Sequence, residues 1–587
     1  EKVTMRNDRL VAILLVGLIL GACQLDPKGS GHADSVLVGG KIFTVNDAQP
    51  WAQAVAIKNG KFLYVGDDSG AQGFVGPETV RHDLKGKLVI PGMVDAHTHP
   101  GAMGRYPAPA PLPVTSKEDI LAAVKAYSEA NPDLRWIKMC CWPIHLYGNG
   151  LQGPHKRDLD AIVPDQPVWL ASDIGHSIWV NSVALKMMGV DRHTPDPVPD
   201  MAIYGRDADG DLTGWIKEKT YRPFMKQFFK IDQEANRKGI VTFLDYLNRH
   251  GVTSLYDAGN TYFHDEIYSF LAELDRAGKL PVRIEGSYHI ILPGQEVEAV
   301  EQLQRLRRTY GGDRLRFNTV KIHFDGSNEN RTGAVLEPFS DDPGNRGNTL
   351  FNTAELRDLI LRLHEARVDL HVHTVGDRGV RIVLDAVEGA REALGGELYT
   401  RATVTHLDII DTDDYPRFKK LGVVANYTPA WHGRNTGDPV MFALGKERFE
   451  RTLMAQPLFD DGAAVTFSSD ITSLGSMPGA NPFLGMQTAH NRQYPEEEGM
   501  AGSDPPEIRL PLSERLRIED LIRGYTLNGA YQLRMDDRIG SIEVGKLADL
   551  VVLEKNLFEV DRYEISKVKP ETVIMEGKII YGELQDR

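Results

Sequence analysis

Residues 88–99 read Leu88-Val89-Ile90-Pro91-Gly92-Met93-Val94-Asp95-Ala96-His97-Thr98-His99. They predict an apolar strand, a Pro-Gly turn and a short continuation that ends in two histidines. Alternate residues of a strand share one face, so His97 and His99 can present both imidazoles to one metal ion. A lone His-x-His pair is weak evidence, and the rest of the chain must decide its meaning.

Eight apolar, β-rich runs alternate with helical stretches along the chain. Alternating strands and helices predict a parallel sheet, and eight strands close a (β/α)₈ barrel. We therefore predict an α/β fold built on a TIM-like (β/α)₈ barrel. The runs lie at 88–95, 252–256, 282–285, 319–322, 369–373, 403–406, 423–426 and 465–470, and the helical stretches include 116–130, 236–250, 353–367 and 516–533.

The two ends of the chain share the same strand character. Short apolar runs turn at Asn59-Gly60 near the start and at Glu576-Gly577 near the end, and Asn-Gly is a strong hairpin signal. We expect one small β-sandwich domain made from residues 23–88 and 535–587. The hydrolase barrel then spans 89–534, and 101–250 is a long insertion after the first barrel strand that covers the barrel mouth.

Composition excludes some classes of protein. The 587 residues carry a formal net charge of −15, which repels a phosphate backbone, so we expect no nucleic acid partner. Only three cysteines occur. Cys140 and Cys141 are neighbours that we do not expect to bridge without strain, so no disulfide framework is predicted.

The first residues have the pattern of an export signal. Arg6 and Arg9 precede an apolar run from Leu10 to Leu20, which is too short to span a membrane, and Leu20-Gly21-Ala22-Cys23 resembles a bacterial lipobox. We expect residues 1–22 to be a lipoprotein signal peptide and Cys23 to carry the lipid anchor. Gln24 then favours the outer membrane of the bacterial cell envelope, facing the periplasm. The alternative is a buried N-terminal helix.

Further polar residues stand where the barrel strands end. His373, His406 and Asp470 end the fifth, sixth and eighth runs, and barrel enzymes place their active residues at these carboxyl ends. Taken singly, His406 could be a core histidine and Asp470 a helix cap. Lys321 lies within the fourth run, where it points either into the barrel or outward between helices.

Together these residues resemble the amidohydrolase superfamily, specifically its YtcJ-like branch. The resemblance covers nearly the whole mature chain. It includes the His-x-His pair, Val320-Lys321-Ile322-His323-Phe324-Asp325-Gly326, His373-Thr374-Val375-Gly376-Asp377, Thr405-His406, Ser468-Ser469-Asp470, Gly251-Val252-Thr253-Ser254, Trp179-Val180-Asn181-Ser182, Asn481-Pro482-Phe483, 525–530 and 545–550.

The resemblance implies a site for one or two divalent metal ions, usually zinc. His97 and His99 would hold the more buried ion, His373 and His406 the more exposed one, and a carbamylated Lys321 would bridge them. Asp470 would be both a ligand and the general base and acid for attack of metal-bound hydroxide on a non-peptide carbon–nitrogen bond of a small molecule. Ester or lactone cleavage is the alternative reaction, and a metal- or ligand-binding surface lipoprotein is the alternative class.

Substrate contacts are predicted less sharply. His176, Trp179, Glu218 and Asp377 are the candidates, although His176 could simply pack at the surface and Asp377 could cap a helix. His371 shares a face with His373 and is a neighbour of the ligands or a substitute for one. Homodimerisation stays open. The aromatic residues of the insertion could enclose a pocket or form its core: Trp142, Trp169, Trp179, Tyr204 and Trp215.

Overall fold

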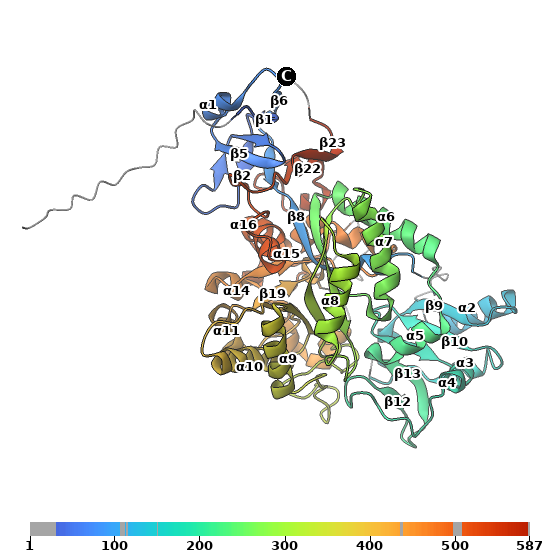
Figure 1. Cartoon of the computed structure of the whole chain (residues 1–587). Coiled ribbons are helices and arrows are strands. Elements are labelled where there is room, and N and C mark those ends of the chain that lie inside the picture. Colours follow the sequence, from blue (N-terminus) through green and yellow to red (C-terminus); the bar gives the residue numbers. More distant parts are fainter. Residues whose placement is uncertain are drawn as a thin grey trace, which may run out of the picture.

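An eight-stranded parallel sheet forms the centre of the structure, a computed structural model that describes residues 31–105, 112, 116–148, 151–434, 438–496 and 507–584. The first and last strands of this sheet contact each other, which confirms the TIM-like barrel (Figure 1). Each of the eight predicted runs contributes one strand to the barrel, and the first run, 88–95, also contributes β7 (Leu88–Pro91) to another sheet. In sheet order they are β8 (Met93–Thr98), β14 (Val252–Asp257), β15 (Arg283–Ile290), β16 (Leu315–His323), β17 (Asp369–Thr374), β18 (Ala402–His406), β19 (Val424–Tyr427) and β20 (Val465–Phe467).

Helices surround the barrel because each carries an apolar stripe. Helix α9 (Thr353–Ala366) buries residues at helical spacing, and Asn352 and Glu355 form a capping box at its start. The stretch predicted as one helix over 516–533 is two helices, α16 (Ile518–Tyr525) and α17 (Leu527–Gln532), because Thr526 leaves the helical conformation at φ −124° and ψ −91°. The other large barrel helices are α6 (Gln233–Arg249), α7 (His264–Arg276), α8 (Ala299–Tyr310) and α10 (Asp377–Leu394).

Strands from both chain ends pair in one sheet beside the barrel (Figure 1). Both expected hairpins form, and the turn residues Asn59, Gly60, Glu576 and Gly577 all have positive φ. The sandwich arrangement and the boundaries of this domain stay predictions. The shared sheet runs β23 (Lys578–Gly582), β22 (Pro570–Met575), β21 (Leu550–Leu553), β7 (Leu88–Pro91), β2 (Lys41–Phe43), β3 (Trp51–Ala52), and a second sheet runs β5 (Lys61–Gly66), β4 (Ala54–Lys58), β1 (Ser35–Val38), β6 (Val80–Asp83).

The segment after β8 contains a five-stranded sheet of its own. Its aromatic side chains are buried against one another, so they form the core of the insertion. Helix α6, which lies inside the predicted 101–250 segment, packs instead on the barrel core. The inserted strands are β12 (Tyr204–Arg206), β13 (Leu212–Lys217), β11 (Ser177–Val180), β10 (Val168–Ser172) and β9 (Ile137–Trp142) in sheet order.

Cys140 and Cys141 form a disulfide bond with each other. The expectation of no disulfide was wrong. The bridge is accompanied by a φ of +75° at Cys141, a strained backbone conformation for a residue with a side chain.

The predicted signal peptide and the lipid-carrying Cys23 lie outside the described residues. Among the residues that are described, no helix is both long enough and apolar enough to cross a membrane.

Candidate metal centre

His97, His99 and Asp470 meet at the carboxyl edge of the barrel. The carboxylate Oδ1 of Asp470 lies 3.4 Å from Nε2 of His97 and 3.2 Å from Nε2 of His99. The backbone N–H of Asp470 donates to the carbonyl of His97 over 2.9 Å, which fixes the end of β20 beside β8. One donor atom from each of the three residues lies within 4.8 Å of the others, so this group can hold a metal ion.

His373 and His406 lie beside this group. Their ring centroids are 4.3 Å apart, and the ring of His406 is 5.0 Å from that of His97. The Nδ1 of His406 is 3.9 Å from Oδ2 of Asp470. The five side chains that the sequence assigned to a metal centre therefore gather at one edge of the sheet.

Lys321 lies inside the barrel below the histidines. Its residue is 2% exposed, and the neighbouring strands place His289 and His371 opposite it. Among the described residues its Nζ has no hydrogen-bond partner. Burial lowers the pKa of Lys321 well below its ordinary value and so favours the neutral amine. The alternative of an outward lysine is excluded.

The protonation states suit metal ligation. Burial lowers the pKa of His97 to about 3, so its imidazole is neutral at physiological pH. The histidine rings around Asp470 hold the pKa of its carboxyl well below its ordinary value, against the effect of burial. A neutral imidazole and an ionised carboxylate are the forms that bind cations.

A chain of buried hydrogen bonds determines which ring nitrogen of His97 carries the proton. The side-chain amide of Gln532 donates to the carbonyl oxygen of Ala96 over 2.7 Å. Its amide oxygen accepts from the hydroxyl of Thr466 over 2.7 Å. Because that hydroxyl has one proton, its oxygen accepts from the amide of Asn426, 2.9 Å away. The amide oxygen of Asn426 is thus left as an acceptor.

The chain ends at the imidazole of His97. The hydroxyl of Thr405 donates to Asn426 over 2.7 Å, so its oxygen can only accept from Nδ1 of His97, 3.1 Å away. The proton therefore sits on Nδ1, which also faces Nε2 of His371 at 2.8 Å. The lone pair is left on Nε2, the nitrogen that faces Asp470.

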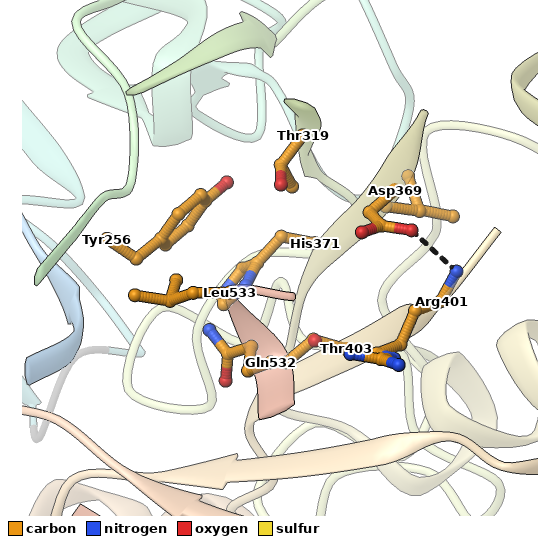
Figure 2. A pocket seen from close by; sticks show the side chains of 9 residues that line it. Tyr256, Thr319, Asp369, His371, Arg401, Thr403, Gln532 and Leu533 are labelled. Atoms are coloured by element: carbon orange, nitrogen blue, oxygen red, sulfur yellow. Dashed lines mark hydrogen bonds between the residues drawn. The ribbon is translucent and has the colours of Figure 1, made fainter. Parts of the chain in front are cut away.

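A small cavity lies beside His371, toward the beginnings of β17 and β18, where Asp369 and Arg401 line it (Figure 2). Tyr256 stacks on the ring of His371 with centroids 4.5 Å apart. The backbone N–H of Arg401 donates to Asp369 over 2.8 Å at the cavity wall. The cavity has no room for a water-sized molecule, so this side of the centre offers no space for a substrate.

His176 and Glu218 also lie next to the centre. Glu218 contacts histidine rings there, whereas the sequence predicts that it contacts the substrate. Glu218 is completely buried. Its Oε2 lies 2.6 Å from Nδ1 of His176 and 3.2 Å from Nε2 of His323. His323 belongs to the motif around Lys321 but is not among the predicted site residues. Its position two residues after Lys321, on the same face of the strand, is the feature of the sequence that could have identified it.

Two other candidates lie elsewhere. Trp179 is fully buried in the core of the insertion against Trp142 and Tyr147, so its ring is not available to a substrate. Asp377 begins α10 and accepts backbone N–H bonds from Leu336 at 2.8 Å and its neighbour Arg378 at 3.0 Å. The alternative that Asp377 caps this helix is not confirmed, because the N-cap residue of α10 is Gly376 and no side chain caps the helix.

The residues present fit a divalent metal ion. Nitrogen and oxygen donors surround a buried space, and several buried nitrogen atoms there lack hydrogen-bond partners within the described part of the chain. Unpaired buried polar atoms are costly, and a cation could pair with those nitrogens that carry a lone pair. These atoms are Nζ of Lys321, Nδ1 of His406, and both ring nitrogens of His289.

Comparison with known proteins agrees with this geometry. The chain is 27% identical to the putative amidohydrolase YtcJ of Bacillus subtilis over 92% of its own length and 98% of that protein. It is 25% identical to the N-substituted formamide deformylase of Arthrobacter pascens over 93% and 98% of the two chains.

A solved metal-dependent hydrolase from Pyrococcus furiosus has the same fold, with a TM-score of 0.61, 25% identity, and coverage of 89% of this chain and 99% of that one. The model of the amidohydrolase family matches residues 82–581. The chain therefore belongs to the amidohydrolase family, in its YtcJ-like branch, and is a metal-dependent hydrolase that acts on carbon–nitrogen bonds.

Proposed function

We propose that the protein hydrolyses an amide-type, non-peptide carbon–nitrogen bond of a small molecule, with Asp470 as general base and then general acid. The observation that carries this proposal is the meeting of Asp470 with His97 and His99 at the open edge of the barrel. The similarity to an N-substituted formamide deformylase supports a small amide or formamide as the substrate class.

A divalent cation held by these residues, for which the imidazole donors favour zinc, would supply Lewis acidity to a carbonyl and would lower the pKa of water. Asp470 is the partly buried, ionised carboxylate at the centre, and it can accept the proton of the attacking water. It can then return that proton to the departing nitrogen. The neutral His97 ring keeps its Nε2 lone pair for the cation because its Nδ1 donates to Thr405.

We propose in addition that Lys321 is carbamylated. Carboxylation needs a neutral amine, and the buried environment of Lys321 favours that form. A carbamate would place oxygen donors where the unpaired Nζ now lies. Native mass spectrometry at neutral pH and after acid treatment tests this: an acid-labile mass equal to carbon dioxide supports it, and its absence at neutral pH contradicts it.

A substrate panel tests the proposed reaction. The zinc-loaded protein should release amine from N-substituted formamides or other small amides, and Asp470→Asn should lose that activity. Turnover restricted to esters or lactones would select the alternative reaction. Bound metal without hydrolysis of amides, cyclic imides, esters or lactones would favour a ligand-binding protein.

We also propose that Cys23 anchors the mature chain to the bacterial outer membrane, facing the periplasm. The apolar run before a Leu-Gly-Ala-Cys motif supports this. Expression of the chain and of Cys23→Ser, followed by membrane fractionation, tests it. The unmodified chain should be found with the outer membrane, and equal membrane association of both proteins would contradict the proposal.

A further inference from the structure

Three histidines form a second cluster next to the Asp470 group. His176, His323 and His373 each offer one ring nitrogen, and these nitrogens lie within 4.8 Å of one another. The ring centroids are 4.3 Å apart for His323 and His373, 5.4 Å for His176 and His373, and 5.5 Å for His176 and His323. Three imidazoles arranged as a triangle are a common way to hold a transition metal ion.

The three histidines come from two parts of the fold. His323 and His373 face each other in register on the paired strands β16 and β17. His176 comes from the loop between β10 and β11 of the insertion. The cluster exists only because the insertion brings His176 against the open edge of the barrel.

Buried acceptors orient all three rings. The carboxylate of Glu218 faces Nδ1 of His176 at 2.6 Å and Nε2 of His323 at 3.2 Å. The carbonyl of Gly326 faces Nε2 of His373 at 2.9 Å. Carboxylate and carbonyl oxygens accept hydrogen bonds, so these ring nitrogens carry protons. The opposite nitrogens keep lone pairs: Nε2 of His176, and Nδ1 of His323 and of His373.

Glu218 itself is held firmly. It is completely buried and has φ +56°, a conformation that costs energy for a residue with a side chain. Its other oxygen accepts from the hydroxyl of Thr332 over 2.5 Å and from the amide of Asn330 over 3.2 Å. A carboxylate fixed behind ligand histidines is the arrangement that orients imidazoles and increases their basicity in metal sites.

We infer that His176, His323 and His373 form a second metal site, separate from the group of His97, His99 and Asp470, with Glu218 as its positioning residue. Three imidazole donors suit zinc or a similar transition metal ion, whereas magnesium and calcium need oxygen donors. This site goes beyond the proposed reaction and does not depend on which bond the enzyme cleaves.

This assignment differs from the pairing of His373 with His406 that the family resemblance implies. His406 lies on the side of Asp470, with its Nδ1 3.9 Å from Oδ2 of that residue. His373 belongs to both arrangements and cannot distinguish them. His176 and His323 belong only to the new site.

Metal stoichiometry tests the inference. The full chain, loaded with zinc and freed of excess metal, is measured by elemental analysis beside His176→Gln, His323→Gln and the control His250→Gln. The control histidine lies at the end of α6 and bonds the carbonyl of Tyr246 over 2.8 Å. We expect about two zinc ions per chain for the unmodified protein and the control, and about one for each cluster variant. Equal zinc content in all four proteins would overturn the inference.

A second variant covers the case in which a histidine substitution disturbs folding. Glu218→Gln retains the shape of the side chain, and we expect one zinc ion to bind about 10–100-fold more weakly while the other keeps its affinity. Competition with a coloured chelator measures both affinities. Unchanged affinity for both ions would remove Glu218 from this role.

Failure of the proposed reaction can be distinguished from failure of the second metal site. An inactive protein that still binds two zinc ions, one of them lost in His323→Gln, would contradict the proposed reaction and support the second site. An active amidase whose zinc content is unchanged by His176→Gln and by His323→Gln would support the reaction and contradict the second site.

Discussion

The hydroxyl oxygen of Thr405 lies 3.1 Å from Nδ1 of His97 and can only accept a hydrogen bond from it. The direction of that bond depends on the amide of Gln532, three hydrogen bonds away through Thr466 and Asn426. The structure thus links the tautomer of a candidate metal ligand to a glutamine that is not in contact with its ring.

Gln532→Met should weaken metal binding at the site of His97. Methionine has nearly the same length but offers no good acceptor, so the hydroxyl of Thr466 loses its partner and the defined order of donors is lost. We expect zinc affinity to fall by about 10–100-fold, as for other residues that orient ligands. The control is Gln487→Met, which removes the acceptor of the backbone N–H of Ser566, a bond that is not part of this chain. Equal affinities of the two variants would contradict the proton chain.

Asp470→Asn should keep bound metal but lose most turnover. The amide oxygen can still face the cation, but the amide cannot accept and return a proton. We expect kcat to fall by about 10²–10⁴-fold, the usual effect of removing a general base. Steady-state kinetics and elemental analysis of the same preparation measure both properties. A fully active variant would remove Asp470 from proton transfer.

Metal removal should destabilise the folded chain. A ligand that binds only the native state contributes about 4 kcal/mol when its concentration is a thousand times its dissociation constant. We therefore expect dialysis against a strong chelator to lower the melting temperature and added zinc to restore it. A melting temperature that is indifferent to chelation and to zinc would show that the centre is not occupied in solution.

Asp549 should be essential for joining the barrel to the shared terminal sheet. Its carboxylate forms a buried ion pair with Arg283 and accepts the backbone N–H of Glu576 over 2.9 Å. Asp549→Ala leaves a buried guanidinium with less compensation and should cost about 3–5 kcal/mol. The control Asp47→Ala breaks an exposed ion pair with Arg523 and should cost less than about 1 kcal/mol. Denaturant unfolding measures both, and equal losses would contradict the prediction.

Glu576 should contribute to acid sensitivity of the same junction. Burial opposes its charge, but Arg283 and Arg314 outweigh that and hold the pKa of Glu576 below its ordinary value of 4.5. A lowered pKa means that the unfolded chain binds the proton more readily. The stabilisation is therefore present above that ordinary value and is lost as the pH falls through the folded pKa. Glu576→Gln should flatten this part of the stability profile, and an unchanged profile would exclude Glu576 as its source.

Much of the fold follows from local patterns. The eight strand runs, the Asn59-Gly60 hairpin and the strand-end positions of His97, His373, His406 and Asp470 all depend on residues close together in sequence. Apolar runs and turn residues reveal such features because backbone conformation is set largely by near neighbours.

The sequence alone determined that a barrel would carry histidines and Asp470 at one edge, since the carboxyl ends of parallel strands must meet there. Only the tertiary structure decided that Trp179 is core, that Glu218 stands behind His176 and His323, and that Gln532 directs the proton of His97. Each of these depends on contacts between segments far apart in the chain. Such contacts are fixed by packing and by the need to pair every buried polar atom, and neither requirement is visible in a local run of residues.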